Sequence, residues 1–541
     1  MLGFLDGLRK GKTLRKEKTE DRVKVDQGVS IKKLRGSYPF ITFINTVDEY
    51  PIQPQVSRVK IVKGPNLGEG LHYVVDEDPL NEQEYDTFSK IMRILSKELE
   101  PPEKSDISHE DYILKRARGV AFRYRRSLGQ FNDQGWEKIF YYIVRELAGY
   151  GSLHTMFLDP NIEDISCNGL NSPLYVWHSK YEGIPTNIAF TDEQTANDFI
   201  VKLAHKGTQH ISTARPLLDA MLPEKHRLAA TFMKEVSTRG STFCIRKFRA
   251  QPFSIVELIQ RRTLNEQMAA YFWLLLEHKM SLMFIGGTGA GKTSLLNASL
   301  SLLSPNDKIV TVEETPEINP PLENWTQLHS RQSFQFGSAT TTSIDLFDLM
   351  KMSLRYRPDY IIVGEIRGEE AYVLFQALAT GHGGLCTIHA DSLENVVKRL
   401  TSEPMNVSEV YIPLMNSAIY INRVELPKPV RGITFGRRIQ NIWEIEDFGV
   451  YRELSTWKPN DDTFDTRFED SYHLKQIAFN ASIAFEEVLK ELDERATFLR
   501  DMVDSGVRGQ IAVAEKILSY YSKKRVKKGD INSLSITQQR P

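Results

Sequence analysis

The sequence predicts an α/β protein with a parallel-rich sheet in its main domain, α+β domains before that domain and helices after it. Three observations predict this fold class. From residue 251 onward, apolar strands alternate with helices, the pattern of a parallel sheet covered on both faces. Before residue 250, short strands and helices follow one another less regularly. Near the C-terminus, the stretch 482–521 has a long helical periodicity.

Composition excludes several classes of protein. At about 100 to 200 residues per domain, a chain of 541 residues holds about three to five folding units. Hydrophobic residues make up 41% and charged residues 26%, which is the composition of a globular protein and not of a disordered chain or a rod. The 69 Lys and Arg against 70 Asp and Glu leave a net charge of -1, so no overall field favours a nucleic-acid or acidic partner.

Cysteine usage and apolar runs indicate the compartment. Cys167, Cys244 and Cys386 are odd in number and widely spaced, which gives no disulfide framework and no paired metal ligands. The longest apolar run, 268–276, has nine residues, whereas a membrane-spanning helix needs about 20. The first residues lack the order of charge, apolar run and cleavage site that marks a signal peptide. We therefore expect a cytoplasmic protein.

The first 36 residues are basic, with eleven Lys and Arg against five Asp and Glu and a local net charge of +6. One interpretation is a solvated, flexible tail. The other is a docking element, because Met1, Phe4, Leu5 and Leu8 share one helical face just before the positive charges. Such a pattern is typical of segments that bind an anionic membrane surface.

The segment 37–115 is expected to be a small α+β domain. Strand patterns occur at 40–44, 56–62 and 71–75. A helix is expected over 82–99, because Asn81 and Glu84 form a capping-box pattern at its start and Pro101 follows its end.

The segment 116–250 is expected to be a second N-terminal α/β domain and linker, entered through a charged connector with helical periodicity. We expect helices at 136–147 and 192–205, strands at 164–169 and 174–177, and a hinge at 251–254, where proline disfavours a helix. The remainder is divided into the main domain, a C-terminal strand and helical subdomain, and a tail, at 251–425, 426–525 and 526–541.

A glycine-rich loop lies between an apolar strand at 282–285 and a helix that continues through 294–300. It matches G-x-x-x-x-G-K-[ST] and consists of Gly286, Gly287, Thr288, Gly289, Ala290, Gly291, Lys292 and Thr293. Glycines let successive backbone N–H groups and the helix N-terminus converge on phosphate oxygens. Lys292 is expected to bind the β- and γ-phosphates, and the Thr293 hydroxyl to bind Mg²⁺. The loop therefore predicts a nucleoside triphosphate site.

Clustered acids follow two of the strands in this region. One strand, beginning at Lys308, ends in Glu313, Glu314 and Glu317, and another ends at Glu365. Because the carboxyl ends of parallel strands face one crevice, an acid there can hold a water near the γ-phosphate. A charged loop is the alternative for the first cluster. Many P-loop proteins have Asp where this chain has Gly364, so we expect Glu365 to reach Mg²⁺ through water.

Two histidines, His382 and His389, flank a short strand. A metal site there would need further ligands, and only Cys386 is near in sequence. We expect a γ-phosphate sensor or a polar link to a neighbouring subunit, with a satisfied core histidine as the alternative.

Four motifs, in this order, resemble those of the type II/IV secretion system ATPase superfamily. They are the loop at 286–293, the Glu-Glu-Thr-Pro-Glu box at 313–317, the Leu-Arg-x-x-Pro-Asp-x-Ile-Ile-Val-Gly-Glu-Ile-Arg signature at 354–367 and the Thr-Gly-His-Gly-Gly box at 380–384. In the family these are the Walker A, Asp-box, Walker B and His-box elements. Upstream stretches, such as Ile162-Glu-Asp-Ile-Ser-Cys-Asn-Gly, are similar to its N-terminal domain and linker, so the resemblance covers about 135–421.

The resemblance implies a homo-hexameric ring motor with a RecA-like ATPase domain, a mobile N-terminal domain, ATP and Mg²⁺. It puts the water-activating acid at Glu313, with Glu314 and Glu317 beside it, and the Walker B acid at Glu365. It also implies arginines that reach the nucleotide from the other domain or subunit, with surface cations as the alternative. These are Arg215, Arg227, Arg239 and Arg246. The implied partners are a polytopic membrane platform protein and pilin-like or archaellin-like substrates, with the motor at the inner face of the cytoplasmic membrane.

Three departures from the family pattern are present. Glu314 stands where Asp is usual, Gly368 stands where many members have Asp, and the paired Cys-x-x-Cys zinc module of many bacterial members is missing. Together with the N-terminal extension and the helical end, this is similar to archaeal members that drive archaella or pili.

We therefore predict ATP hydrolysis by in-line attack of water, coupled to filament assembly or secretion. A RecA-like motor that translocates nucleic acid is the alternative, because both tails are basic, but these basic residues lack the interleaved aromatics that stack on bases. A ring that binds nucleotide without hydrolysing it is a third class, which the intact loop and acids disfavour.

Overall fold

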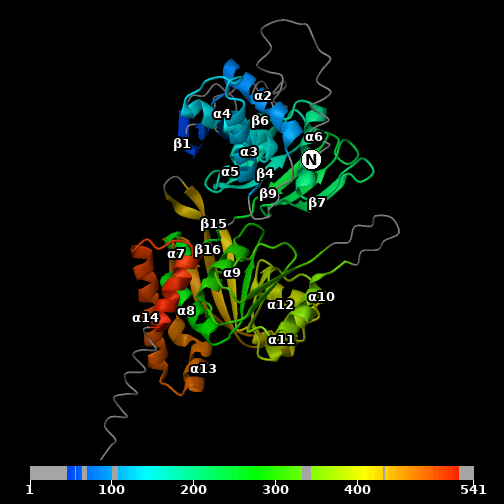
Figure 1. The fold of residues 1–541 in the computed structure, drawn as a ribbon. Coiled ribbons are helices and arrows are strands. Elements are labelled where there is room, and N and C mark those ends of the chain that lie inside the picture. Colours follow the sequence, from blue (N-terminus) through cyan, green and yellow to red (C-terminus); the bar gives the residue numbers. More distant parts are fainter. Residues whose placement is uncertain are drawn as a thin grey trace, which may run out of the picture. The chain divides into compact units, whose positions relative to one another are not determined.

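The computed structural model describes residues 45–54, 56–63, 70–99, 108–249, 251–331, 343–430 and 433–522. The chain divides into two compact units, the first of which ends at Arg249 (Figure 1). The basic segment 1–36, the expected strand at 40–44 and the tail 526–541 lie outside the described residues. The finer domain boundaries expected from the sequence stay predictions.

The first unit is built on a sheet with the strand order β1-β2-β3-β6-β5-β4-β9-β8-β7. Its strands are β1 Asn45–Gln53, β2 Ser57–Lys63, β3 Leu71–Glu77, β4 Ile162–Cys167, β5 Pro173–His178, β6 Glu182–Ala189, β7 Leu217–Met221, β8 Arg227–Thr231 and β9 Thr242–Arg246. Neighbours run antiparallel except β3 and β6, which pair in parallel at Tyr73 and Thr186. Strands from both N-terminal segments therefore share one sheet.

Three helices of the first unit share a core of their own. They are α2 Glu82–Glu98, α3 His109–Arg123 and α4 Asp133–Leu147, and they pack through Ile91, Ile113, Ala117 and Ile139, among others. The predicted capping box of α2 is confirmed, because Asn81 and Glu84 each accept the other's backbone N–H. The remaining helices are α5 His154–Leu158 and α6 Glu193–Lys206, which follows its N-cap Asp192.

The second unit is built on a sheet with the strand order β12-β11-β13-β14-β10-β15-β16-β17-β18. The strands from β12 to β15 pair in parallel, and β16, β17 and β18 add antiparallel strands at one edge. Their bounds are β10 Leu282–Gly286, β11 Ile309–Glu313, β12 Trp325–His329, β13 Tyr360–Val363, β14 Gly383–His389, β15 Ser417–Val430, β16 Ile433–Asp447, β17 Val450–Lys458 and β18 Thr463–Thr466. This is the expected RecA-like, parallel-rich α/β domain.

Helices cover both faces of this sheet, so its central strands are buried throughout (Figure 1). One core lies under α7 Ile255–Gln260, α8 Glu266–Glu277, α9 Lys292–Ser299, α13 Tyr472–Ala481 and α14 Phe485–Asp504, together with a last helix over 510–522. The other lies under α10 Leu346–Ser353, α11 Glu370–Ala379 and α12 Leu393–Thr401. The apolar run at 268–276 lies in α8 and is wholly buried. Within the described ranges, no helix combines the length and apolarity needed to span a bilayer.

The C-terminal helices are fixed to α8 by a buried arginine. Arg495 of α14 is 2% exposed, stacks on Trp273 with its guanidinium carbon 4.7 Å from the ring centre, and pairs with Glu277 and Glu491. The Trp273 indole donates to the Tyr521 hydroxyl at 2.7 Å. The predicted long helical end is therefore confirmed as helices packed on the main domain.

Arg495→Ala is expected to lower the free energy of unfolding of the second unit by about 3 kcal/mol, because it removes one partner from a buried ionic cluster. Urea unfolding, together with amide hydrogen exchange of α8 and α14, measures the loss. The matched control is Arg500→Ala on the same helix, whose ion pair to Glu266 is exposed and 3.7 Å long. It is expected to cost less than about 1 kcal/mol. Equal losses for the two variants would contradict the structural role of Arg495.

Candidate nucleotide site

The glycine-rich loop connects β10 to α9, as predicted. Gly289 and Gly291 have φ angles of +72° and +98°, in the left-handed region that favours glycine. At Gly286 a Cβ atom would lie 2.3 Å from the carbonyl oxygen of Ile421, so only glycine lets β10 and β15 approach each other here. At Gly287 and Gly289 an added Cβ would meet nothing within 4 Å. The loop thus has a close-packed base and an open outer surface.

Lys292 lies inside the curl of this loop. Its side chain is largely buried, and its Nζ donates to the carbonyl oxygen of Gly287 at 2.9 Å. Burial lowers the pKa of Lys292, and the negative charge of Glu365 partly opposes that shift. Thr293, the second residue of α9, is half-buried.

Two side chains from other strands hold the loop from outside. The Thr288 hydroxyl lies 3.0 Å from Nε2 of His389, the last residue of β14. Arg437 of β16 donates from Nε to the carbonyl oxygen of Gly289 at 3.1 Å. The strand register places Gly286 directly opposite His389, so the contact between Thr288 and His389 follows from the parallel pairing of β10 and β14.

Glu313 ends β11 and is 2% exposed. Its carboxylate accepts the backbone N–H groups of Glu317 and Ile318 at 2.6 and 2.7 Å and the Gln327 amide at 3.0 Å. Burial raises the pKa of Glu313 to about 7, although these three donors oppose the shift. The carboxylate is therefore turned toward the chain that follows β11, and the water-activating role expected for Glu313 stays a prediction.

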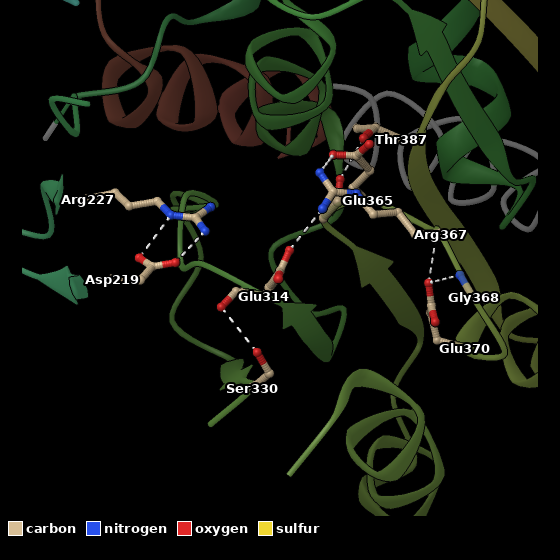
Figure 2. Close-up of polar contacts among 10 residues, drawn as sticks. Asp219, Arg227, Glu314, Ser330, Glu365, Arg367, Gly368, Glu370 and Thr387 are labelled. Atoms are coloured by element: carbon tan, nitrogen blue, oxygen red, sulfur yellow. Dashed lines mark hydrogen bonds and ion pairs between the residues drawn. The ribbon is translucent and has the colours of Figure 1, made fainter. Parts of the chain in front are cut away.

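Arg367 lies between two further acids of the site, Glu314 and Glu365 (Figure 2). Its guanidinium donates to Glu314 at 3.2 Å and to Glu365 at 2.8 Å, and all three side chains are partly exposed. Arg367 was not among the predicted site residues, although it belongs to the Gly-Glu-Ile-Arg signature. Glu317, in contrast, contributes its backbone, donating its N–H to Glu313 and accepting from Asn297 through its carbonyl oxygen.

Gly364 stands where many P-loop proteins have Asp, Gly368 is a departure from the family pattern, and both glycines have close neighbours. A Cβ at Gly364 would lie 3.3 Å from Cγ of Glu313, so a side chain there would press on the buried acid. A Cβ at Gly368 would lie 3.1 Å from a carboxylate oxygen of Glu370, which accepts the backbone N–H groups of Arg367 and Gly368 (Figure 2). An aspartate at either position would also place a second negative charge beside an existing one.

The structure separates the two histidines of the His box. His389 lies at the loop, whereas His382 precedes β14, with Nδ1 3.0 Å from the Thr380 hydroxyl and 3.1 Å from the carbonyl oxygen of Ala377. Seven residues of extended chain span about 23 Å. Within this chain His382 therefore lies at the opposite end of β14 from the loop, and its expected role as a γ-phosphate sensor or a polar link to a neighbouring subunit stays a prediction.

The four predicted arginines all lie in the first unit. Arg227 and Arg246 are opposite each other on β8 and β9 and pair with Asp219 at 2.9 Å and with Asp164 at 3.2 Å. The first pair is drawn in Figure 2. Arg215 forms a β-bridge with Ser212, and the carbonyl oxygen of Arg239 accepts the N–H of Leu170. Their contact with a nucleotide stays a prediction.

A cavity of about 670 Å³ opens beside the loop. Gly287, His389 and Arg367 line it, together with residues of α12 that include Asn395 and Lys398. In the part of the chain that the structure describes, no group of three or more His, Cys, Asp or Glu side chains is arranged to hold a metal ion.

Known proteins match this chain across the site. The family model described as type II/IV secretion system protein matches residues 161–424. An uncharacterized protein of Methanocaldococcus jannaschii is 35% identical over 408 residues, which cover 74% of this chain and 73% of that protein. The conjugal transfer protein TrbB of Rhizobium radiobacter is 30% identical over 254 residues, which cover 46% of this chain and 74% of TrbB. A solved structure of the Legionella pneumophila ATPase DotB is similar at 17% sequence identity and a TM-score of 0.40. The alignment covers 70% of this chain and 92% of the DotB chain.

The raised pKa of Glu313 predicts a pH-dependent stability. A carboxyl whose pKa is raised by folding binds its proton more tightly in the folded chain, so its contribution to stability falls as pH rises from about 4.5 to about 7 and is constant above. Relative to Glu313→Gln, the wild type is expected to lose up to about 3 kcal/mol across that window. Urea unfolding of both proteins between pH 5 and 8 measures the difference, and parallel curves would contradict the assignment.

Proposed function

The chain belongs to the type II/IV secretion system protein family and is an ATPase, and from that premise we propose that it is a hexameric cytoplasmic motor. In this proposal it hydrolyses ATP to assemble or secrete pilus-like filament subunits through a polytopic platform protein at the inner face of the cytoplasmic membrane. The observation that carries the ATPase part is the placement of Lys292 inside the glycine loop, where its Nζ donates to the carbonyl oxygen of Gly287.

The loop and Lys292 bind the triphosphate. Open space above Gly287 and Gly289 leaves room for phosphate oxygens beside the loop and the N-terminus of α9. The Lys292 ammonium then neutralises charge at the β- and γ-phosphates, where negative charge develops as the bond to the leaving group breaks. Because this lysine is already buried and oriented, little reorganisation is needed when charge develops.

Glu365 orients the attacking water in this proposal. It is the Walker B acid, its oxygens are partly exposed, and its charge acts on Lys292. Arg367 is a positioning residue, because it holds Glu365 and Glu314 at once. Thr293 and Glu365 supply the hard oxygen donors that Mg²⁺ prefers, and a bound Mg²⁺ would neutralise charge on the transferred phosphoryl group.

The partners follow from the family and not from contacts in this chain. The similarity to a Methanocaldococcus jannaschii protein agrees with the expected archaeal type of pilus or archaellum motor. Arginines of the first unit, such as Arg227 and Arg246, would complete the site when a ring closes. The basic segment 1–36 is proposed to contact the platform protein or the anionic membrane surface.

A nucleic-acid motor is the second candidate, because one relative is named a conjugal transfer protein. Single-stranded DNA would then stimulate hydrolysis, and the stimulation would fall steeply as salt is raised. Hydrolysis that is indifferent to DNA at all salt concentrations would favour the filament motor.

Lys292→Ala is expected to lower ATP turnover by about 100-fold or more, since one preorganised charge on the transition state is lost. Phosphate release from purified protein with magnesium measures this. Lys351→Ala, which removes an exposed lysine of α10, is the matched control and should turn over ATP like the wild type. Unchanged turnover in Lys292→Ala would place hydrolysis at some other site.

Glu365→Gln is expected to bind ATP but to hydrolyse it about 100 to 10,000-fold more slowly, because the variant cannot accept a proton from the attacking water. Nucleotide binding by fluorescence and single-turnover cleavage separate the two steps. Glu394→Gln, at an exposed position of α12, is the charge-matched control. If Glu313→Gln lost cleavage while Glu365→Gln kept it, the water-activating role would belong to Glu313, as the sequence predicted.

A further inference from the structure

Helix α3 and the turn after it carry a basic face in the first unit. Exposed residues recur at helical spacing, with Lys115, Arg118 and Phe122 on the helix and Arg125 in the turn. From Tyr112 to Arg126 the sequence contains Lys115, Arg116, Arg118, Arg123, Arg125 and Arg126 and no acidic residue. The acidic residues of α3 are confined to its first turn. The opposite face packs into the core that α3 shares with α2 and α4 (Figure 1).

A large apolar side chain lies in the middle of these charges. Phe122 is 73% exposed, and the guanidinium carbon of Arg125 is 5.0 Å from its ring centre. Gly119 lies one turn earlier on the same face, where an added Cβ would meet nothing within 4 Å. Glycine inside a helix costs about 1 kcal/mol relative to alanine, and no packing among the described residues of this unit requires it here. Because Gly119 has no side chain, the helix surface beside Phe122 is flat. An extended binding surface can therefore approach the helix backbone there.

Arg123 does not belong to this exposed face, because its side chain takes part in the contact between α2 and α3. Its guanidinium pairs with Glu98 of α2 at 2.9 Å, and that carboxylate also accepts from the Tyr124 hydroxyl. Arg123 is thus part of the packing between α2 and α3. The exposed stripe consists of Lys115, Arg118, Phe122 and Arg125. It combines cationic side chains with one exposed aromatic ring.

We propose that this face binds an anionic lipid surface, with Phe122 inserted among the headgroups and the surrounding cations on lipid phosphates. Basic side chains near such a surface contribute about 1 kcal/mol each, and an aromatic residue between them adds apolar burial. Proteins that bind single-stranded nucleic acid use several aromatic side chains to stack on the bases, and this face has one exposed aromatic ring. The inference deepens the proposed function, because it rests on that function for the position of the chain beside a membrane.

The test is flotation of the full-length protein with vesicles of equal phosphatidylglycerol and phosphatidylcholine. Lys115→Gln with Arg118→Gln is expected to lower the partition coefficient about 30-fold at 0.1 M salt, with a smaller difference at 1 M salt. Phe122→Ser is expected to lower it several-fold at both salt concentrations, because insertion of the ring does not depend on screening. The segment 1–36 is kept in every variant, so the comparison isolates the α3 face.

The matched control is Lys490→Gln with Lys516→Gln, which removes two exposed charges from helices of the second unit and should bind vesicles like the wild type. ATP hydrolysis in solution by all variants should equal that of the wild type, so a failed motor and a failed lipid contact are distinguishable. Partition of the α3 variants within twofold of the wild type would overturn the proposal. Equal binding to pure phosphatidylcholine, or loss of single-stranded DNA binding with intact vesicle binding, would also overturn it.

Discussion

The site depends on the parallel pairing of β10, β11, β13 and β14. Parallel strands send their carboxyl ends to one edge of a sheet, so residues more than 100 positions apart in sequence meet there. Gly286 lies opposite His389, and Gly364 lies beside Glu313. The strands hold this register because they are buried on both faces, and a displaced strand would expose apolar side chains or lose its hydrogen bonds.

This edge gathers several charges, of which Lys292 and Glu313 are buried, and each charge has a compensating contact. Lys292 donates to the loop backbone, Glu313 accepts three hydrogen bonds, and Arg367 bridges the two exposed acids. Such contacts offset the desolvation of buried polar groups. They also orient the groups before any substrate is bound, which is the condition for electrostatic catalysis.

The helix that follows the glycine loop is linked to the C-terminal helices. Gln510 donates from its amide to the carbonyl oxygen of Asn297 in α9 at 2.8 Å, and the same amide reaches the carbonyl oxygen of Phe253. Arg495 fixes the neighbouring helix α14 to α8. The second unit therefore contains a continuous series of contacts from α9 to its C-terminal helices, and close-packed interiors transmit displacements between such elements.

The sequence by itself determined the features that depend on neighbours along the chain. Three such features are the glycine loop at 286–293, the apolar strand before it and the capping box of α2. They follow from local conformational preference and burial, and the sequence predicted each of them at the observed position. Only the tertiary structure decided where the side chains of the site turn. His382 lies away from the loop, the Glu313 carboxylate faces backbone N–H groups, and Arg367 bridges two strand ends. These outcomes depend on which strands pair and which donors then lie beside each carboxylate, and that proximity is created by pairing between distant segments.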